Sequence, residues 1–120
     1  EVVAKGKGAG PAEKVGSSYY NIGVASMAIA VEAARLALEK GNAVTAESLK
    51  QGFDSIKDFD AQGLMPAITI TPKDHQGGGR GRISQWDGAK WVPKTDWYAA
   101  YQDIVWELVK KNAEEFKKSN

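Results

Sequence analysis

The stretch from Gly6 to Pro11, GKGAGP, has the glycine-rich composition of a phosphate-binding loop. The Walker pattern needs a lysine followed by serine or threonine after its last glycine, and the dinucleotide-binding pattern needs a glycine where Pro11 stands. Neither requirement is met. The sequence therefore favours a plain loop over a phosphate site.

A second glycine-rich stretch, GGGRGR from Gly77 to Arg82, resembles segments that bind single-stranded RNA through arginine. Such segments usually recur many times in long disordered tracts, whereas this chain has one copy flanked by strand-like sequence. A flexible connection between strands is the favoured interpretation. A small nucleic-acid-binding module that uses Gly77–Arg82 is retained as the alternative function.

The neighbours Asp74 and His75 could donate two metal ligands, but the chain has 1 histidine and 0 cysteines. Two adjacent ligands without a third at suitable spacing make a weak site, so no metal is expected. Carboxylates such as Asp54 and Asp87 are plentiful, yet nothing in the sequence pairs any two of them as acid and base. No enzyme mechanism, no catalytic residue and no cofactor are predicted.

The composition indicates one domain with a modest core, since the chain has 120 residues of which 42% are hydrophobic. Its net charge of +1 provides no overall field that would attract nucleic acid or an anionic membrane. The first residues do not resemble a signal peptide and lack an initial methionine, so we expect that the chain begins at a cut.

Glycine, proline and lysine in the first 16 residues predict a flexible N-terminal segment. Ser17 or Ser18 can then cap a long helix that ends at Gly41. The apolar residues of this helix lie on all its sides, which is typical of a buried packing helix. Two charged residues, Glu32 and Arg35, interrupt the run, and this argues against a membrane span.

Shorter elements are predicted to follow. Thr45 caps a second helix that ends near Lys57, and alternating β-branched residues predict a strand at 67–71. The stretch QWDGAKWV at 85–92 predicts a hairpin around an Asp-Gly turn. A final helix is expected from Thr95 or Asp96. The predicted strands would form only a small sheet. We expect that this sheet needs further strands from outside this chain to be complete.

Several of these stretches, taken in order, resemble one family. They are a tyrosine-started alanine-rich helix, a T-x-E-x-L helix, a T-x-T-P-x-D-H turn and a Q-W-D-G-x-W-V hairpin, spanning about Val15 to Trp97. In this combination the chain resembles the C-terminal part of the substrate-binding proteins of branched-chain amino acid ABC transporters, which are type I periplasmic binding proteins.

The resemblance implies an α/β fold, as a C-terminal fragment of a two-lobed type I periplasmic binding protein in the order helix, helix, strand, hairpin, helix. The implied function is capture of a branched-chain amino acid or a related small amide or acid by hinge closure, and its delivery to the permease. The implied location is periplasmic or extracytoplasmic. The expected partners are a small-molecule solute, an ABC permease and the N-terminal part of the same chain, with no nucleic acid.

The resemblance also points to a site. In the family, the segment that enters the alanine-rich helix lies near the ligand cleft, which here makes Tyr19 and Tyr20 candidate ligand-binding residues, with Ser17 and Ser18 as weaker candidates. The expected domains are a flexible segment at 1–16, part of the binding-protein domain at 17–97 and a C-terminal helix at 98–120. An isolated fragment is expected to be oligomeric or swapped, because it would leave apolar faces uncovered.

Overall fold

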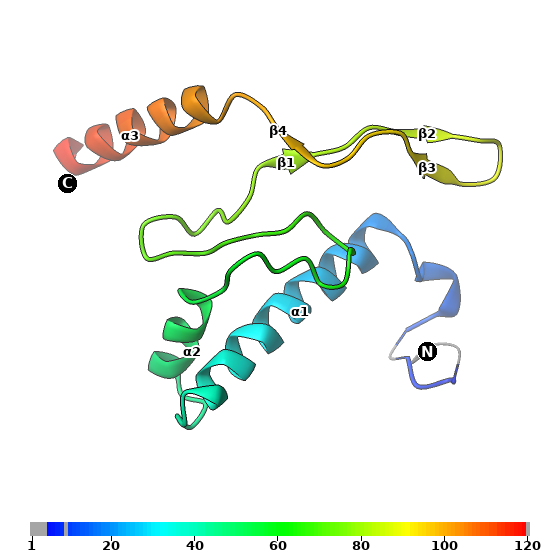
Figure 1. Ribbon diagram of the computed structural model, residues 1–120, viewed down its shortest axis with the longest axis horizontal. Coiled ribbons are helices and arrows are strands. Elements are labelled where there is room, and N and C mark those ends of the chain that lie inside the picture. The colour runs from blue at the N-terminus through cyan, green and yellow to red at the C-terminus, as the bar shows by residue number, and fades with distance from the viewer. Residues whose placement is uncertain (1–4, 9, 120) are drawn as a thin grey trace. The chain divides into compact units, whose positions relative to one another are not determined.

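The computed structural model describes residues 5–8 and 10–119 and contains three α-helices (Figure 1). It divides into two compact units, residues 1–78 and 79–120. In chain order the elements are η1 (Ala12–Lys14), α1 (Ser18–Glu39), α2 (Ala46–Phe53), β1 (Arg80–Gly81), β2 (Ser84–Trp86), β3 (Trp91–Pro93), β4 (Tyr98–Ala99) and α3 (Gln102–Ser119).

Helix α1 begins and ends where its local sequence predicts. The Ser17 hydroxyl accepts a hydrogen bond from the Tyr20 backbone N–H at 3.3 Å, which satisfies one of the amides left without a partner in the first turn. After Glu39 the chain turns at Gly41, whose φ of 76° is readily adopted by glycine. The predicted long helix is confirmed.

Helix α2 has a reciprocal N-terminal cap. Thr45 donates its N–H to the Ser48 hydroxyl at 2.9 Å, and the Ser48 N–H is donated to the Thr45 hydroxyl at 3.2 Å. The predicted cap is correct, but the helix ends at Phe53, before the predicted end near Lys57. The reason is that Ile56 leaves the helix, enters the core and accepts a hydrogen bond from the Ile70 N–H at 3.0 Å.

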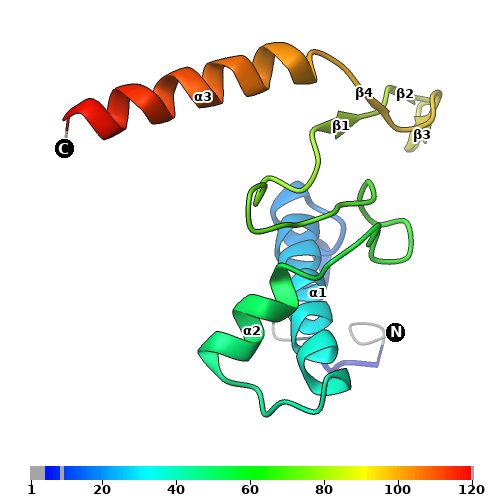
Figure 2. The same cartoon turned by 60° about the vertical axis from the view of Figure 1, so that its left-hand side comes forward.

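The core of the first unit lies where α1 and α2 cross (Figure 2). Ala33 and Ala37 of α1 are buried, as is Ile56 after α2. Gly52 of α2 lies so close to α1 that an added Cβ would overlap with the carbonyl oxygen of Ala33. Small residues on both helices therefore allow their backbones to approach.

The segment predicted as a strand at 67–71 is extended but forms only isolated bridges. Phe59 pairs with Ile68, and Thr71 pairs with Asp74 within a turn. Gly77 supplies the carbonyl that accepts from the Thr69 N–H at 2.9 Å. Because its hydrogen bonds go to separate loop residues, this segment does not form a continuous ladder.

The second unit has two antiparallel pairs of short strands, β1 with β4 and β2 with β3. The predicted hairpin is confirmed, with Trp86 opposite Trp91 and their rings edge to face at 5.7 Å between centroids. Its turn spans 87–90 and is held by the Asp87 carboxylate, which accepts from the backbone N–H groups of Ala89 and Lys90, both at 2.9 Å.

Helix α3 begins at Gln102, later than the predicted Thr95 or Asp96. The residues before it are extended because Tyr98 and Ala99 pair with β1. The Gln102 amide donates a hydrogen bond to the Gly79 carbonyl at 3.1 Å, so the start of the helix is tied to the chain that enters β1.

The predicted fold class is wrong. The described residues form three α-helices and two small antiparallel sheets, and strands of two or three residues replace the sheet expected of an α/β fragment of a type I periplasmic binding protein. An α/β sheet joins parallel strands through crossover helices, and residues 5–8 and 10–119 contain no parallel pair. The domain limits at 16 and 97 stay predictions, and residues 1–4, 9 and 120 lie outside the described residues.

The contact between α1 and α2 can be tested at two glycines. Gly52→Ala should destabilise the protein by about 1–3 kcal/mol, because the new methyl group overlaps with the backbone of α1. Gly23→Ala, in a part of α1 where a Cβ meets no atom within 4 Å, should instead stabilise it by about 0.5–1 kcal/mol. Urea unfolding measures both. Equal effects of the two substitutions would contradict the close approach.

Candidate functional site

An open groove of about 630 Å³ lies within the first unit, between α1, α2 and the loop that follows α2. Its floor consists of large apolar side chains that are only partly buried, together with Ala46; these side chains are Ile29, Leu49, Phe53, Ile68 and Ile70. We call it the α1–α2 groove. Its size is in the range of small-molecule sites, which are mostly apolar with few polar groups.

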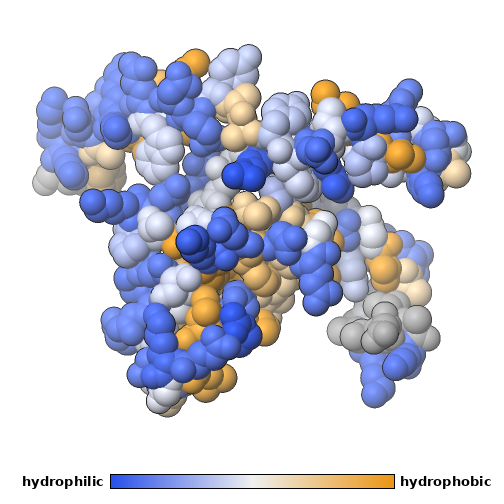
Figure 3. Space-filling model, in the orientation of Figure 1, coloured by the Kyte–Doolittle hydropathy of each residue, from blue (hydrophilic) through white to orange (hydrophobic). Residues whose placement is uncertain are grey.

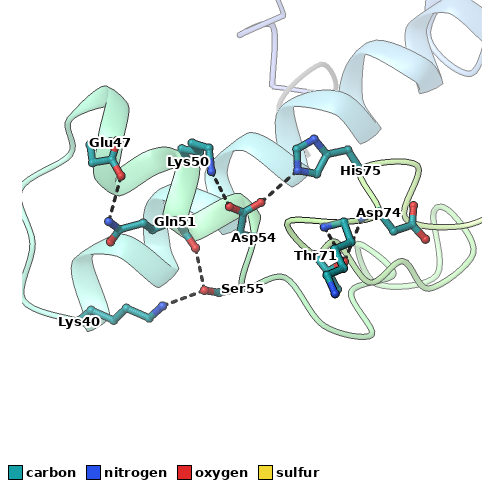
Figure 4. A network of polar contacts seen from close by, with 10 residues as sticks. Lys40, Glu47, Lys50, Gln51, Asp54, Ser55, Thr71, Asp74 and His75 are labelled. Carbon is teal, nitrogen blue, oxygen red and sulfur yellow. Dashed lines mark hydrogen bonds and ion pairs between the residues drawn. The ribbon is translucent and has the colours of Figure 1, made fainter. Parts of the chain in front are cut away.

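The polar groups of the α1–α2 groove gather at one rim (Figure 4). Asp54 is at their centre: its Oδ2 accepts from the Lys50 ammonium at 2.9 Å, and its Oδ1 lies 3.3 Å from Nε2 of His75. Gln76 completes the rim. The side chain of Asp54 is 14% exposed, whereas those of Lys50 and His75 are 63% and 65% exposed. One carboxylate therefore holds two exposed nitrogen-bearing groups at the mouth of the groove.

These contacts shift two pKa values in opposite directions. The hydrogen bond from Lys50, helped by the nearby His75, lowers the pKa of the Asp54 carboxyl below its ordinary 3.8. The same hydrogen bond raises the pKa of Lys50 above 10.5. Asp54 is consequently ionised and Lys50 is charged at neutral pH.

The four residues predicted to bind ligand lie at the start of α1. Ser17 is its N-cap, Ser18 to Tyr20 form its first turn, and Tyr19 is 89% exposed while Tyr20 is 37% exposed. Tyr19 and Tyr20 line a shallow hollow of about 500 Å³ together with Gly23, Val24 and Met27. The structure brings the two tyrosines together, and their contact with a ligand stays a prediction.

The other candidate residues have structural contacts. Arg82 lies over the ring of Trp97, with its guanidinium carbon 4.4 Å from the ring centroid, and Arg80 belongs to β1. The Asp74 carboxylate accepts the Gln76 N–H at 2.9 Å and thereby shapes its own turn. No group of three or more potential metal ligands occurs within residues 5–8 and 10–119.

The charged rim was not identified from the sequence. Lys50 lies on α2 and Asp54, four residues later, is the C-cap of that helix, and this spacing alone predicts a contact on one helix face. The sequence gives no such indication for His75. This residue comes close to Asp54 only because of the way the loop between Ile56 and Gly77 folds back.

Among the residues that the structure describes, one helix, α1, is long and apolar enough to cross a membrane by length and composition. The core helix of a soluble protein and a signal sequence pass the same criterion. Large apolar side chains of α1 are exposed, and Figure 3 shows apolar surface over α1 and α2. The exposed apolar side chains of α1 include Ile22, Met27, Val31 and Leu38.

No family model and no curated protein matches the chain. A solved structure described as an ABC transporter permease from the Pseudomonas fluorescens group is similar, with 34% sequence identity and a TM-score of 0.74. The similarity covers 91% of this chain and 28% of that one. The chain thus spans less than a third of the length of its structural neighbour.

This comparison corrects the family prediction. The neighbour is named a permease, which is the membrane component of an ABC transporter, so the identification as a substrate-binding protein of the type I periplasmic class is contradicted. The predicted function of capturing a solute by hinge closure is contradicted for the same reason. Of that prediction, only the relation to ABC transporters is supported.

The same comparison also contradicts the predicted partners and the predicted location. A permease was expected as a partner, whereas the neighbour's name is that of the permease itself. A periplasmic or extracytoplasmic location is contradicted by the same name, and α1 has the length and composition of a membrane helix. Glu32 and Arg35, the charged residues that interrupt the apolar run of α1, form an ion pair at 2.6 Å, and such pairing lowers the cost of charges in an apolar medium.

The rim of the α1–α2 groove gives a pH-dependent prediction. Because the folded-state pKa of Asp54 is lowered, its ionised form should stabilise the fold above pH 3.8, and this contribution should disappear as the pH falls through the lowered value. Asp54→Asn should therefore have a lower melting temperature than the wild type at pH 7 and the same one in strong acid. Thermal unfolding from pH 7 to pH 2 measures this. A difference that is independent of pH would refute the ion-pair interpretation.

Proposed function

We propose that this chain is part of the permease component of an ABC transporter, in which α1 crosses the membrane. The observation that carries the proposal is the similarity to the solved permease, with 34% identity over 91% of the chain. The proposed role is to form part of a transport path, and it assigns no catalytic step to this chain.

The exposed face of α1 supports this role. Met27 and Val31 are 64% and 63% exposed although α1 is the most apolar helix in the described part of the chain. An apolar face of this length is costly in water and is stabilised by lipid tails or by neighbouring membrane helices.

The charges of α1 are compatible with this environment. Arg35 donates hydrogen bonds to both carboxylate oxygens of Glu32, at 2.8 and 2.6 Å, and also contacts Glu39. Charged residues of membrane helices commonly pair with one another in this way. All three residues lie in the last two and a half turns of the helix, where longer side chains can reach the membrane surface.

The location of α1 can be tested with a charge introduced on its exposed face. The double substitution Met27→Asp and Val31→Asp should expel α1 from a bilayer, because each aspartate costs about 2.5–3.5 kcal/mol at the centre of a membrane helix. In cells that produce the complete protein containing this chain, the wild type should stay in the membrane pellet after alkaline carbonate washing, and the double variant should be largely released.

A matched control is available on α3. Ile104 and Leu108 are 50% and 54% exposed, so Ile104→Asp with Leu108→Asp adds the same charge at a similar exposure. This control should remain in the pellet. Recovery of the wild-type protein in the soluble fraction would overturn the proposal, since the apolar face of α1 would then be covered by protein.

A further inference from the structure

The second unit has no core of its own: none of residues 79–119 is buried. On its β2–β3 hairpin, Trp86 and Trp91 are 51% and 68% exposed. The two residues are directly opposite each other on antiparallel strands, so their side chains project from the same face of the hairpin. We call this the tryptophan face. Two adjacent large rings are unfavourable in water, so a partner that covers them stabilises the hairpin.

The tryptophan face suits a partner that is not purely apolar. Each indole has one N–H donor, and neither indole of this face donates a hydrogen bond to any residue that the structure describes. Positive charge is also in excess, since residues 79–101 contain four basic residues and two acidic ones. One of the acidic residues, Asp87, accepts hydrogen bonds from the backbone N–H groups of Lys90 and Ala89, which lower its pKa below 3.8. A matching partner therefore offers apolar surface, hydrogen-bond acceptors and negative charge.

We propose that the tryptophan face binds the surface of a membrane that contains anionic phospholipids. This inference rests on the proposed function, because it needs a membrane beside the chain. The headgroup region of such a membrane has ester and phosphate oxygens that accept from the indole N–H groups, and the upper parts of the acyl chains cover the rings. Tryptophan is enriched at this depth of membranes for the same reason.

The lysines of the hairpin favour a lipid surface over an apolar protein surface. Lys90 directly precedes Trp91, and Lys94 follows it by three residues, a distance of about 10 Å along a strand. An anionic surface acts over a similar length at moderate salt, so both lysines add attraction without direct contact. An apolar protein surface would leave this charge and the indole N–H groups unmatched.

Lipid contact of the tryptophan face can be measured by fluorescence quenching. The complete protein is reconstituted into vesicles of phosphatidylcholine and phosphatidylglycerol, with and without phosphatidylcholine brominated in the upper part of its acyl chains, because bromine quenches only nearby tryptophans. The wild type should lose emission in the brominated vesicles, and Trp86→Phe with Trp91→Phe should lose much less. The matched control, Trp97→Phe with Trp106→Phe, removes two less exposed rings and should show the full wild-type loss. Equal losses in the wild type and in the variant of the tryptophan face would overturn the proposal.

The role of charge is tested in the same vesicles. Lys90→Gln with Lys94→Gln should reduce the emission that bromine quenches, because each lysine near an anionic surface contributes about fivefold to binding. Omission of phosphatidylglycerol should have the same effect on the wild type. Lys117→Gln with Lys118→Gln, at the C-terminal end of α3, removes the same charge outside the hairpin and should change nothing. Quenching that depends neither on the hairpin lysines nor on phosphatidylglycerol would contradict binding to an anionic surface.

Failure of this proposal is distinguishable from failure of the proposed function. If α1 does not cross the membrane, alkaline carbonate releases the complete protein. If the protein is retained but its hairpin tryptophans are not quenched, the membrane position of α1 stands. The tryptophan face is then covered by protein or lies in water, and that result overturns this inference alone.

Discussion

The close approach of α2 to α1 at Gly52 is the contact on which the first unit depends. It places the Gly52 α-carbon against the backbone of Ala33, and it brings Phe53 and Asp54 to their places beside α1. Since α2 is only 8 residues long, it is too short to be stable alone in water, and its packing against α1 must stabilise it. The α1–α2 groove and its charged rim exist only while this contact is formed.

The same contact divides α1 into two faces with different requirements. The face with Ala33 and Ala37 is buried by α2, whereas Met27 and Val31 remain exposed on the described chain. Small residues suit the first face because they admit a neighbouring backbone, and large apolar residues suit a lipid or protein environment. The groove lies at the edge of α2, where Ile29 contributes to its floor.

Local features of the fold were predictable from sequence, and long-range features were not. The caps of α1 and α2 and the Asp87 turn depend on residues within a few positions of each other, and all were predicted correctly. The late start of α3 depends on the bond from Gln102 to Gly79, 23 residues away. Likewise, the contact between Lys50 and Asp54 could be predicted from their helical spacing. The contact between His75 and Asp54 could not, because it depends on how the loop after α2 folds. The family prediction failed because no single motif in it was diagnostic.

The account is tested most directly by the environment of α1 in the complete protein. This chain has 0 cysteines, so, once any cysteine in the rest of the complete protein has been replaced, a single spin-labelled cysteine at Met27 can be compared with one at Lys57. Relaxation by oxygen, which concentrates in lipid, and by a water-soluble nickel complex reports the surroundings of each label. The account predicts that the label at position 27 is relaxed mainly by oxygen and the label at position 57 mainly by nickel. Strong relaxation of both labels by nickel would contradict a membrane position for α1.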